Sequence, residues 1–586
     1  MRKPLFAALS ILALAAPVPA QRILVGPDVL VSNENEYPHV EMAVAAHPSD
    51  PKRLVAGTMA LGGASGTQIY ASPDGGATWT PAYPAERIPA EADPLVLYTP
   101  KGTALFVDIP VMTEGSRQLS PLAIYRSEDG GRVWQKPFLL RDHAYDHPQI
   151  AADPRSGRIY LSTLYGRESI LGLFRSDDDG RTFTGPQEVA KLPEDSETGL
   201  NTTGLATLSD GTLVFCYVEY SQEPEKPDDL KLWVRTSADG SVAFSEPVLA
   251  ARMAVLPLSA PRARLSTFPL MTVDGSAGPY RDRIYVVWTD FATGLPRVLI
   301  SASADRGKTW SEPRAAAGPL PEGAYAFQPA IAVNRDGVLG VSWLDTRNAP
   351  GTDRYDAWFT ASLDGGATFL PPVRVSSETS DLQGPGNLRP APGAWRTHEN
   401  VLRVTFLTAA SRYPGGGDYT GLAADASGAF HPIWPDARSG AFQAWTVKVR
   451  VERAPAARTE ARGEPVDLNP SVELSLDPAS YDPATRELRV PIRLRNVSDK
   501  RIRGPLLATV KTFGSGMGER YRENTPTLLN ATNGKPGAGA VFDYTAMMGD
   551  DGFLEPGAVT RPIVWRFKVV DVLTPDMHVE VTGRVE

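Results

Sequence analysis

The sequence predicts an all-β protein that folds into a closed ring of repeated four-stranded sheets and ends in a small β-sandwich. Three observations favour this fold class. A turn motif recurs six times in the first three quarters of the chain. Short apolar runs of strand length alternate with turn residues, as is typical of all-β folds. Gly (52) and Pro (53) make up nearly a fifth of the 586 residues, yet 42% of the chain is hydrophobic, which is ordinary for a folded protein.

The repeated motif reads Ser-x-Asp-x-Gly-x-x-aromatic, with small variations. Its Asp can accept hydrogen bonds from the backbone of its own tight turn, and its Gly can adopt positive φ at little steric cost. The aromatic residue that closes the motif can pack between neighbouring sheets. We therefore assign these carboxylates to structure, and none to catalysis or metal binding. They are Asp74, Asp129, Asp178, Asp239, Asp305 and Asp364.

The motifs lie about 50 to 65 residues apart, which is enough for one four-stranded sheet per repeat. Seven apolar runs mark first strands, one more than the number of motifs. We therefore favour seven sheets, with six as the alternative. The last repeat lacks a fourth strand of its own, and residues 22–31 can supply it, which would close the ring and remove an exposed edge.

This motif resembles the Asp-box, or BNR, repeat of the sialidase-like β-propellers. The resemblance implies a β-propeller fold for residues 21–452. Asp boxes also occur in other glycosidases and in sortilin-type receptors, so the motif argues for the fold more strongly than for a function.

Composition divides the rest of the chain. Residues 1–20 combine a basic start, a short apolar stretch and a small-residue cleavage site, which predicts a signal peptide and export to the periplasm or beyond the cell. The apolar stretch is too short to span a membrane. Residues 453–468 are rich in Ala, Pro and charge and predict a linker. Alternating apolar residues over 469–586 then predict a sandwich of immunoglobulin or fibronectin-III type.

Charge and cysteine content narrow the function classes. The chain has 59 Lys and Arg against 68 Asp and Glu, a formal net charge of −9, which makes nucleic acid a poor partner. Cys216 is the only cysteine, and its apolar setting is typical of a packed thiol rather than a nucleophile. Nothing in the sequence calls for a cofactor or a metal site, while a structural calcium inside the propeller and the oligomeric state are left open.

Polar residues collect where the first strands start and the second strands end, which antiparallel order places on the face opposite the Asp boxes. Such a face can bind a glycan or another polar ligand. The alternative is that these side chains only solvate the rim of the ring. The candidate ligand-binding residues are Asp146, His147, Gln328, Asp345, Arg347, Asp436 and Arg438.

The resemblance to sialidases extends to two further segments. Arg87-Ile88-Pro89 is similar to the family's Arg-Ile-Pro motif, which implies that Arg87 holds a substrate carboxylate. The segment around Tyr419 has the shape of the family's nucleophile segment, which implies attack by Tyr419 with help from Asp418. The family usually has Asn-Glu where this chain has Ser266 and Thr267, so the base for Tyr419 is missing there.

Three hypotheses follow for the function. The first is a sialidase-like propeller that recognises glycans and hydrolyses a terminal acidic sugar. The second is a non-catalytic binding or scaffold propeller. The third is a glycosidase or lyase of another specificity.

Overall fold

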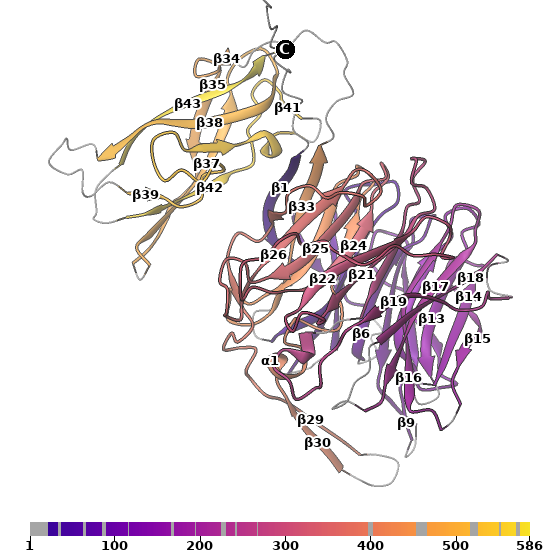
Figure 1. The fold of residues 1–586 in the computed structure, drawn as a ribbon. Coiled ribbons are helices and arrows are strands. Elements are labelled where there is room, and N and C mark those ends of the chain that lie inside the picture. Colours follow the sequence, from indigo (N-terminus) through magenta and orange to yellow (C-terminus); the bar gives the residue numbers. More distant parts are fainter. Residues whose placement is uncertain are drawn as a thin grey trace, which may run out of the picture. The chain divides into compact units, whose positions relative to one another are not determined.

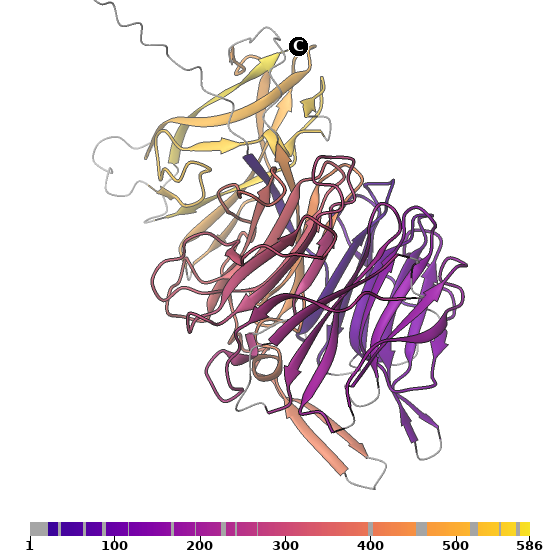
Figure 2. The same ribbon diagram turned by 45° about the vertical axis from the view of Figure 1, so that its right-hand side comes forward.

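A computed structural model shows a chain built almost wholly from antiparallel β-strands, which confirms the all-β prediction (Figures 1 and 2). Every structural statement below concerns the residues that the structure describes. These are 22–32, 37–62, 66–84, 90–114, 117–165, 169–193, 195–223, 230–238, 240, 243–265, 268–396, 402–452, 466–483, 485–515, 526–549, 552–569 and 575–585.

The chain divides into two compact units, Met1–Ala454 and Pro455–Glu586. This boundary falls within the residues that the sequence predicts as a linker, most of which lie outside the described part. The predicted signal peptide lies outside it as well.

The first unit contains seven four-stranded antiparallel sheets, one of which gains a short fifth strand. Three come first along the chain. They are β2 (His39–Ala46), β3 (Leu54–Ala60), β4 (Gly66–Ser72) and β5 (Thr80–Pro81); β6 (Ala90–Tyr98), β7 (Ala104–Pro110), β10 (Leu122–Ser127) and β11 (Phe138–Leu140); and β12 (Asp146–Ala152), β13 (Ile159–Tyr165), β14 (Ile170–Ser176) and β15 (Thr184–Lys191).

The other four sheets follow the same plan. They are β16 (Thr198–Thr207), β17 (Leu213–Ser221), β18 (Leu230–Ser237) and β19 (Val248–Met253); β20 (Leu270–Val273), β21 (Ile284–Asp290), β22 (Arg297–Ser303) and β23 (Arg314–Ala315); β24 (Ala326–Val333), β25 (Leu339–Asp345), β26 (Arg354–Ser362) and β27 (Val373–Arg374), with β28 (Ser380–Asp381) on β26; and β31 (Leu422–Ala424), β32 (Phe430–Asp436), β33 (Gln443–Glu452) and β1 (Arg22–Leu30).

The first strands of the seven sheets form a closed cycle. Contacts run from β2 to β6, β12, β16, β20, β24 and β31 in turn, and β31 contacts β2 again. The N-terminal strand β1 pairs antiparallel with β33, with Arg22 opposite Glu452 and Leu30 opposite Trp445. This pairing confirms the prediction that the N-terminal strand completes the last sheet.

The predicted turn motifs connect the third and fourth strands of their sheets. In the turn before β15, Asp178 accepts a hydrogen bond from the Thr182 backbone at 2.9 Å and one from the Thr182 hydroxyl at 2.6 Å. Asp74, Asp129, Asp305 and Asp364 accept equivalent backbone bonds. These five carboxylates therefore accept hydrogen bonds within their own turns, while Asp239 lies outside the described residues.

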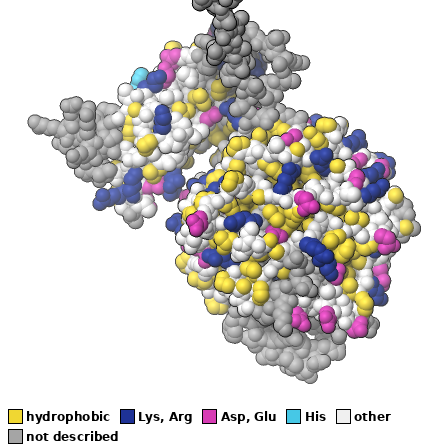
Figure 3. Space-filling model, in the orientation of Figure 1, with side chains coloured by type: hydrophobic (Ala, Val, Ile, Leu, Met, Phe, Trp, Pro, Cys, Tyr) yellow, Lys and Arg dark blue, Asp and Glu magenta, His cyan; other side chains and the backbone are white. Residues whose placement is uncertain are grey.

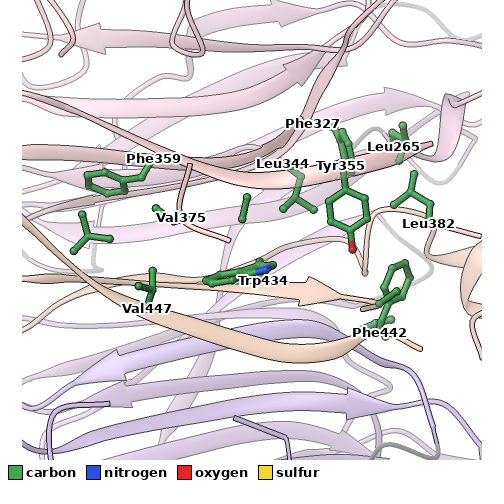
Figure 4. Close-up of a cluster of buried hydrophobic side chains, with 14 of the residues drawn as sticks. Leu265, Phe327, Leu344, Tyr355, Phe359, Val375, Leu382, Trp434, Phe442 and Val447 are labelled. Carbon is green, nitrogen blue, oxygen red and sulfur yellow. The ribbon is translucent and has the colours of Figure 1, made fainter. Parts of the chain in front are cut away.

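Apolar side chains fill the spaces between neighbouring sheets. Figure 4 shows the cluster between the β24–β28 sheet and the last sheet, where Phe327, Tyr355 and Phe359 face Trp434 and Val447. The Tyr355 hydroxyl, buried in this cluster, donates to the Pro435 carbonyl at 2.7 Å. Cys216 is buried in another such cluster, which agrees with a packed thiol.

Two hairpins and a short helix interrupt the repeat. β8 (Met112–Glu114) pairs with β9 (Arg117–Leu119) in the connection after β7, and β29 (Ala391–Arg396) pairs with β30 (Leu402–Leu407) ahead of α1 (Ala409–Arg412) (Figure 1). A capping box between Thr408 and Ser411 starts α1. Two 3-10 turns, Ala263–Leu265 and Thr545–Met547, complete the helical content described.

The second unit has two antiparallel sheets around one apolar core. One contains β34 (Val466–Asp467), β43 (Pro575–Val585), β38 (Ile502–Ser515), β40 (Val541–Asp543) and β41 (Phe553–Leu554); the other contains β35 (Val472–Leu476), β36 (Ser480–Asp482), β37 (Glu487–Asn496), β42 (Ile563–Lys568) and β39 (Thr527–Leu528). Trp565 and Phe542 stack in this core with ring centroids 3.8 Å apart.

Charged side chains of both signs are interspersed on the face of the first unit seen in Figure 3, rather than gathered into one basic patch. In the described part of the chain, no helix is long and apolar enough to cross a membrane.

Candidate functional site

Four first strands carry a β-bulge near their start, and in each the bulge holds a residue other than Gly in the left-handed region. Glu41, Asp93, His147 and Gln328 have φ of 53°, 57°, 45° and 53° in β2, β6, β12 and β24. Side chains larger than Gly rarely adopt this conformation, and such strain collects at functional sites. A bulge also redirects a side chain out of the regular alternation of the strand.

The left-handed conformation links three of these residues through their backbones. The His147 N–H donates to the Asp93 carboxylate at 2.9 Å, and the Asp93 N–H lies 3.4 Å from Glu41 Oε2. The Glu41 N–H in turn donates to the Gly416 carbonyl at 2.8 Å, just ahead of β31. Each of these three bulges thus contacts the sheet before it in the cycle, so β12, β6, β2 and the segment ahead of β31 form one connected site.

Burial perturbs the two carboxyls at the centre of this chain of contacts. Glu41 is 2% exposed, and burial, together with the charges of Asp93 and Asp418, raises its pKa well above the usual value. Burial likewise raises the pKa of Asp93 to about 6, although the nearby His147 opposes the increase. Burial alone would lower the pKa of His147, but the carboxylates of Asp93 and Asp146 outweigh it and raise that pKa. Carboxyls whose pKa values are raised in this way are suited to acid–base chemistry.

The segment ahead of β31 brings Asp418 and Tyr419 to the same site. The Asp418 carboxylate accepts two hydrogen bonds from Arg412 of α1, at 3.3 and 3.4 Å. The Tyr419 hydroxyl donates to the Pro94 carbonyl at 3.0 Å. Burial, followed by the charges of Glu41, Asp93 and Asp418, raises the pKa of Tyr419 well above its usual value.

The structure gives the other candidate residues different positions. Asp146 is exposed next to His147, and Gln328 is buried with its amide donating to the Gly417 carbonyl at 3.0 Å. His147 packs edge-on against Phe268, with ring centroids 4.7 Å apart. Arg87, Ser266 and Thr267 lie outside the described residues.

Two Asp–Arg pairs predicted to bind ligand make their contacts within their own sheets instead. Asp345 accepts from Arg347 and from the Trp343 indole at 2.7 Å, and the Arg347 guanidinium lies 4.1 Å from the Trp358 ring centroid. In the last sheet Asp436 pairs with Arg438, which also pairs with Asp28 and stacks on Trp445 at 4.0 Å. Both ion pairs lie within one sheet, and a role of these four side chains in ligand binding stays a prediction.

One group of side chains has the spacing of metal ligands. Asp93, Asp146 and His147 each offer one ligand atom, and these atoms lie within 4.8 Å of one another. The sequence predicts no metal site, and the hydrogen bond from the His147 backbone already occupies one oxygen of Asp93.

Sequence reasoning did not single out Glu41 and could not place Arg412. The available signal was a Glu inside the apolar run of β2, because a lone charge in a buried strand calls for a partner or a function. Arg412 gave no such signal, since only the short helix that carries it places it beside Asp418.

Comparisons with known proteins agree with the sialidase-like resemblance. No protein-family model matches the chain. A sialidase from Bacteroides fragilis (strain YCH46) is 24% identical over 328 residues, which are 47% of this chain and 54% of that protein. The chain therefore spans about half the length of this relative.

Two solved structures illustrate what the fold is similar to. The Hadza microbial sialidase Hz136 is 14% identical, with 73% of this chain and 92% of that chain covered and a TM-score of 0.39. The Penicillium chrysogenum alpha-L-arabinanase, complexed with arabinobiose, is 16% identical, with 56% and 94% covered and a TM-score of 0.38. These TM-scores are too low to carry an argument about this chain.

Proposed function

We propose that the protein is a sialidase-like glycoside hydrolase that cleaves a terminal acidic sugar from a glycan. One observation carries the proposal: the bulges of two neighbouring first strands bury the carboxyls of Glu41 and Asp93 at the site that also holds Tyr419. Two carboxyls with raised pKa values next to a phenol supply the acid, base and nucleophile that such a hydrolysis needs. The similarity to the Bacteroides fragilis sialidase supports the same class.

Each residue has a role in this proposal. Tyr419 attacks the anomeric carbon, and Glu41 in its ionised form takes the phenol proton, which fills the base position that Ser266 and Thr267 leave open; its raised pKa makes the ionised carboxylate a stronger base. Asp93, whose pKa of about 6 keeps it protonated in mild acid, donates a proton to the leaving oxygen as the glycosidic bond breaks. Water, which gives a proton back to Asp93, then displaces the Tyr419 oxygen from the anomeric carbon, and the free sugar and the phenol are regenerated. Arg412, held by Asp418, lies where a sugar carboxylate can pair with a guanidinium, and Arg87 has the same role by resemblance.

The proposal extends to the organisation of the chain. The seven sheets would be the blades of one Asp-box propeller, and residues 469–586 an immunoglobulin- or fibronectin-III-like sandwich that acts as a spacer or adhesion module. Residues 1–20 would direct export and be removed, so that the enzyme meets its glycan outside the cytoplasm.

Hydrolysis of a fluorogenic sialoside tests the proposal. We expect the wild type to release the fluorophore with a bell-shaped pH dependence, because Asp93 must keep its proton and Glu41 must have lost its own. Tyr419→Phe and Glu41→Gln are expected to abolish release. Tyr98→Phe is the matched control, since Tyr98 is a buried tyrosine in the same strand as Asp93 and lies outside the site. Release that survives Tyr419→Phe would contradict the proposed nucleophile.

One observation favours the second hypothesis, a non-catalytic binding propeller. The Tyr419 hydroxyl donates to a backbone carbonyl rather than to a carboxylate, which leaves the nucleophile without a base in direct contact. If no release occurs at any pH, a glycan array distinguishes the remaining cases. Binding without cleavage would support the binding propeller, and cleavage of a different glycan would support a glycosidase or lyase of other specificity.

A further inference from the structure

Three consecutive glycines, Gly415–Gly417, precede Asp418 and Tyr419. Residues of the two neighbouring sheets donate hydrogen bonds to them. We propose that Gln328 and Gly417 are positioning residues: they hold the Asp418–Tyr419 segment at a set place relative to Glu41, and the proposed hydrolysis depends on that placement. This inference rests on the proposed function, but its structural part can be tested without it.

Hydrogen bonds from three other strands or their flanks hold the segment. Gln328, in the bulge of β24, donates its amide N–H to the Gly417 carbonyl at 3.0 Å. Glu41, in the bulge of β2, donates its backbone N–H to the Gly416 carbonyl at 2.8 Å. The Phe268 N–H, ahead of β20, lies 3.3 Å from the Asp418 carbonyl. The segment is therefore fixed from both of its neighbours in the cycle of sheets.

The glycines are required by this close packing. Gly416 and Gly417 have φ of 91° and 116°, where other residues are strained. A Cβ on Gly417 would lie 2.5 Å from the Glu41 nitrogen and 2.6 Å from its Cγ, and one on Gly416 would overlap Pro435. The missing side chain of Gly417 thus lets the backbone ahead of Asp418 approach the same residue whose carboxyl is proposed to serve Tyr419.

Gln328 is suited to this role by its chemistry. It is 1% exposed, so its bond to the Gly417 carbonyl is shielded from water. An amide supplies the N–H donor without adding a charge, whereas a carboxylate there would face a carbonyl oxygen with no proton to share. A misplacement of about 1 Å in a catalytic group can lower a rate about 100-fold, so losing this one bond should be measurable.

Kinetics of two Gln328 variants on the fluorogenic sialoside test the catalytic part. Gln328→Met removes the donor at similar size, and we expect kcat to fall about 10- to 100-fold with KM nearly unchanged. Gln328→Glu can donate only when its carboxyl is protonated, so its kcat relative to wild type should rise as the pH is lowered, while that of Gln328→Met should not. Equal, pH-independent ratios for the two variants, or an unchanged kcat, would overturn the positioning role.

Hydrogen–deuterium exchange tests the same contact without activity. In Gln328→Met we expect faster exchange in peptides covering 413–421 and unchanged exchange in the other sheets. Gln443→Met is the matched control, because Gln443 is a buried glutamine of β33 that bonds Tyr37 and Ser32 rather than any of the three glycines. Unchanged exchange at 413–421 would refute the inference. Faster exchange with an inactive wild type would instead keep the contact and discard the proposed hydrolysis.

Discussion

The clearest pH prediction concerns His39, a buried histidine at the start of β2. Its ring is 0% exposed, and Nδ1 lies 2.8 Å from the Thr58 hydroxyl, while Nε2 has no partner among the described residues. Burial lowers its pKa from 6.5 to about 4. The folded protein therefore holds His39 neutral over a pH range in which the unfolded chain protonates it.

The sign and size of the effect follow from this difference. Between pH 6.5 and 4 the unfolded state binds one more proton, so stability falls as the pH is lowered through this window. The change in pKa corresponds to about 3 kcal/mol in all, of which about 2 kcal/mol accumulates between pH 7 and pH 4.5. Below about pH 4 both states are protonated, and the loss levels off.

Comparison of wild type with His39→Asn isolates the contribution of His39 to the pH dependence of stability. Asn can keep the hydrogen bond to Thr58, and any packing cost is the same at both pH values. We expect urea unfolding to show that the variant's free energy of unfolding, relative to wild type, improves by about 2 kcal/mol from pH 7 to pH 4.5. The exposed His143, changed to Asn, is the control and should show no such change. A difference for His39→Asn that is constant with pH would refute the reasoning.

Three further predictions concern other buried or paired groups. Burial raises the pKa of Glu41, so its ionisation opposes folding as the pH rises. Glu41→Gln should therefore unfold at a higher urea concentration than wild type at pH 8, and the difference should be small at pH 4. A larger difference at pH 4 than at pH 8 would contradict the raised pKa. Asp364→Ala removes bonds from the Thr368 N–H, the Thr368 hydroxyl and Ser362, and should cost about 1–2 kcal/mol in urea unfolding at pH 7 without changing activity; an unaltered midpoint would mean that the turn does not need its carboxylate. Arg438→Lys keeps the charge but loses the stacking on Trp445 and the paired contacts with Asp28 and Asp436. It should lower the free energy of unfolding by about 1–3 kcal/mol. The control Arg354→Lys, at an exposed arginine, should not change it measurably.

Much of the fold was predictable because its signals are local. The turn motif needs only a carboxylate and a glycine a few residues apart. The hydrogen bonds from Thr182 to Asp178 join residues only four positions apart. The missing strand of the last sheet was predictable by elimination, since an unpaired edge at β33 needs a partner and the N-terminal segment has the right pattern.

The candidate site was predictable only in part. His147, Asp418 and Tyr419 stand out as polar residues beside apolar strands, and the structure brings them to one site. Asp345, Arg347, Asp436 and Arg438 stand out in the same way, but they pair within their own sheets. A polar residue at a strand end gives the same sequence pattern whether its side chain faces a ligand or a neighbouring indole.

By itself, the sequence determined the strands, the turns between them and the side of each strand that is buried, because these depend on residues only a few positions apart. Only the tertiary structure decided that Tyr419 shares one site with Glu41 and Asp93, which lie more than three hundred positions before it in the chain. The physical reason is that a residue's pKa and contacts depend on the left-handed bulges and on closure of the cycle of sheets.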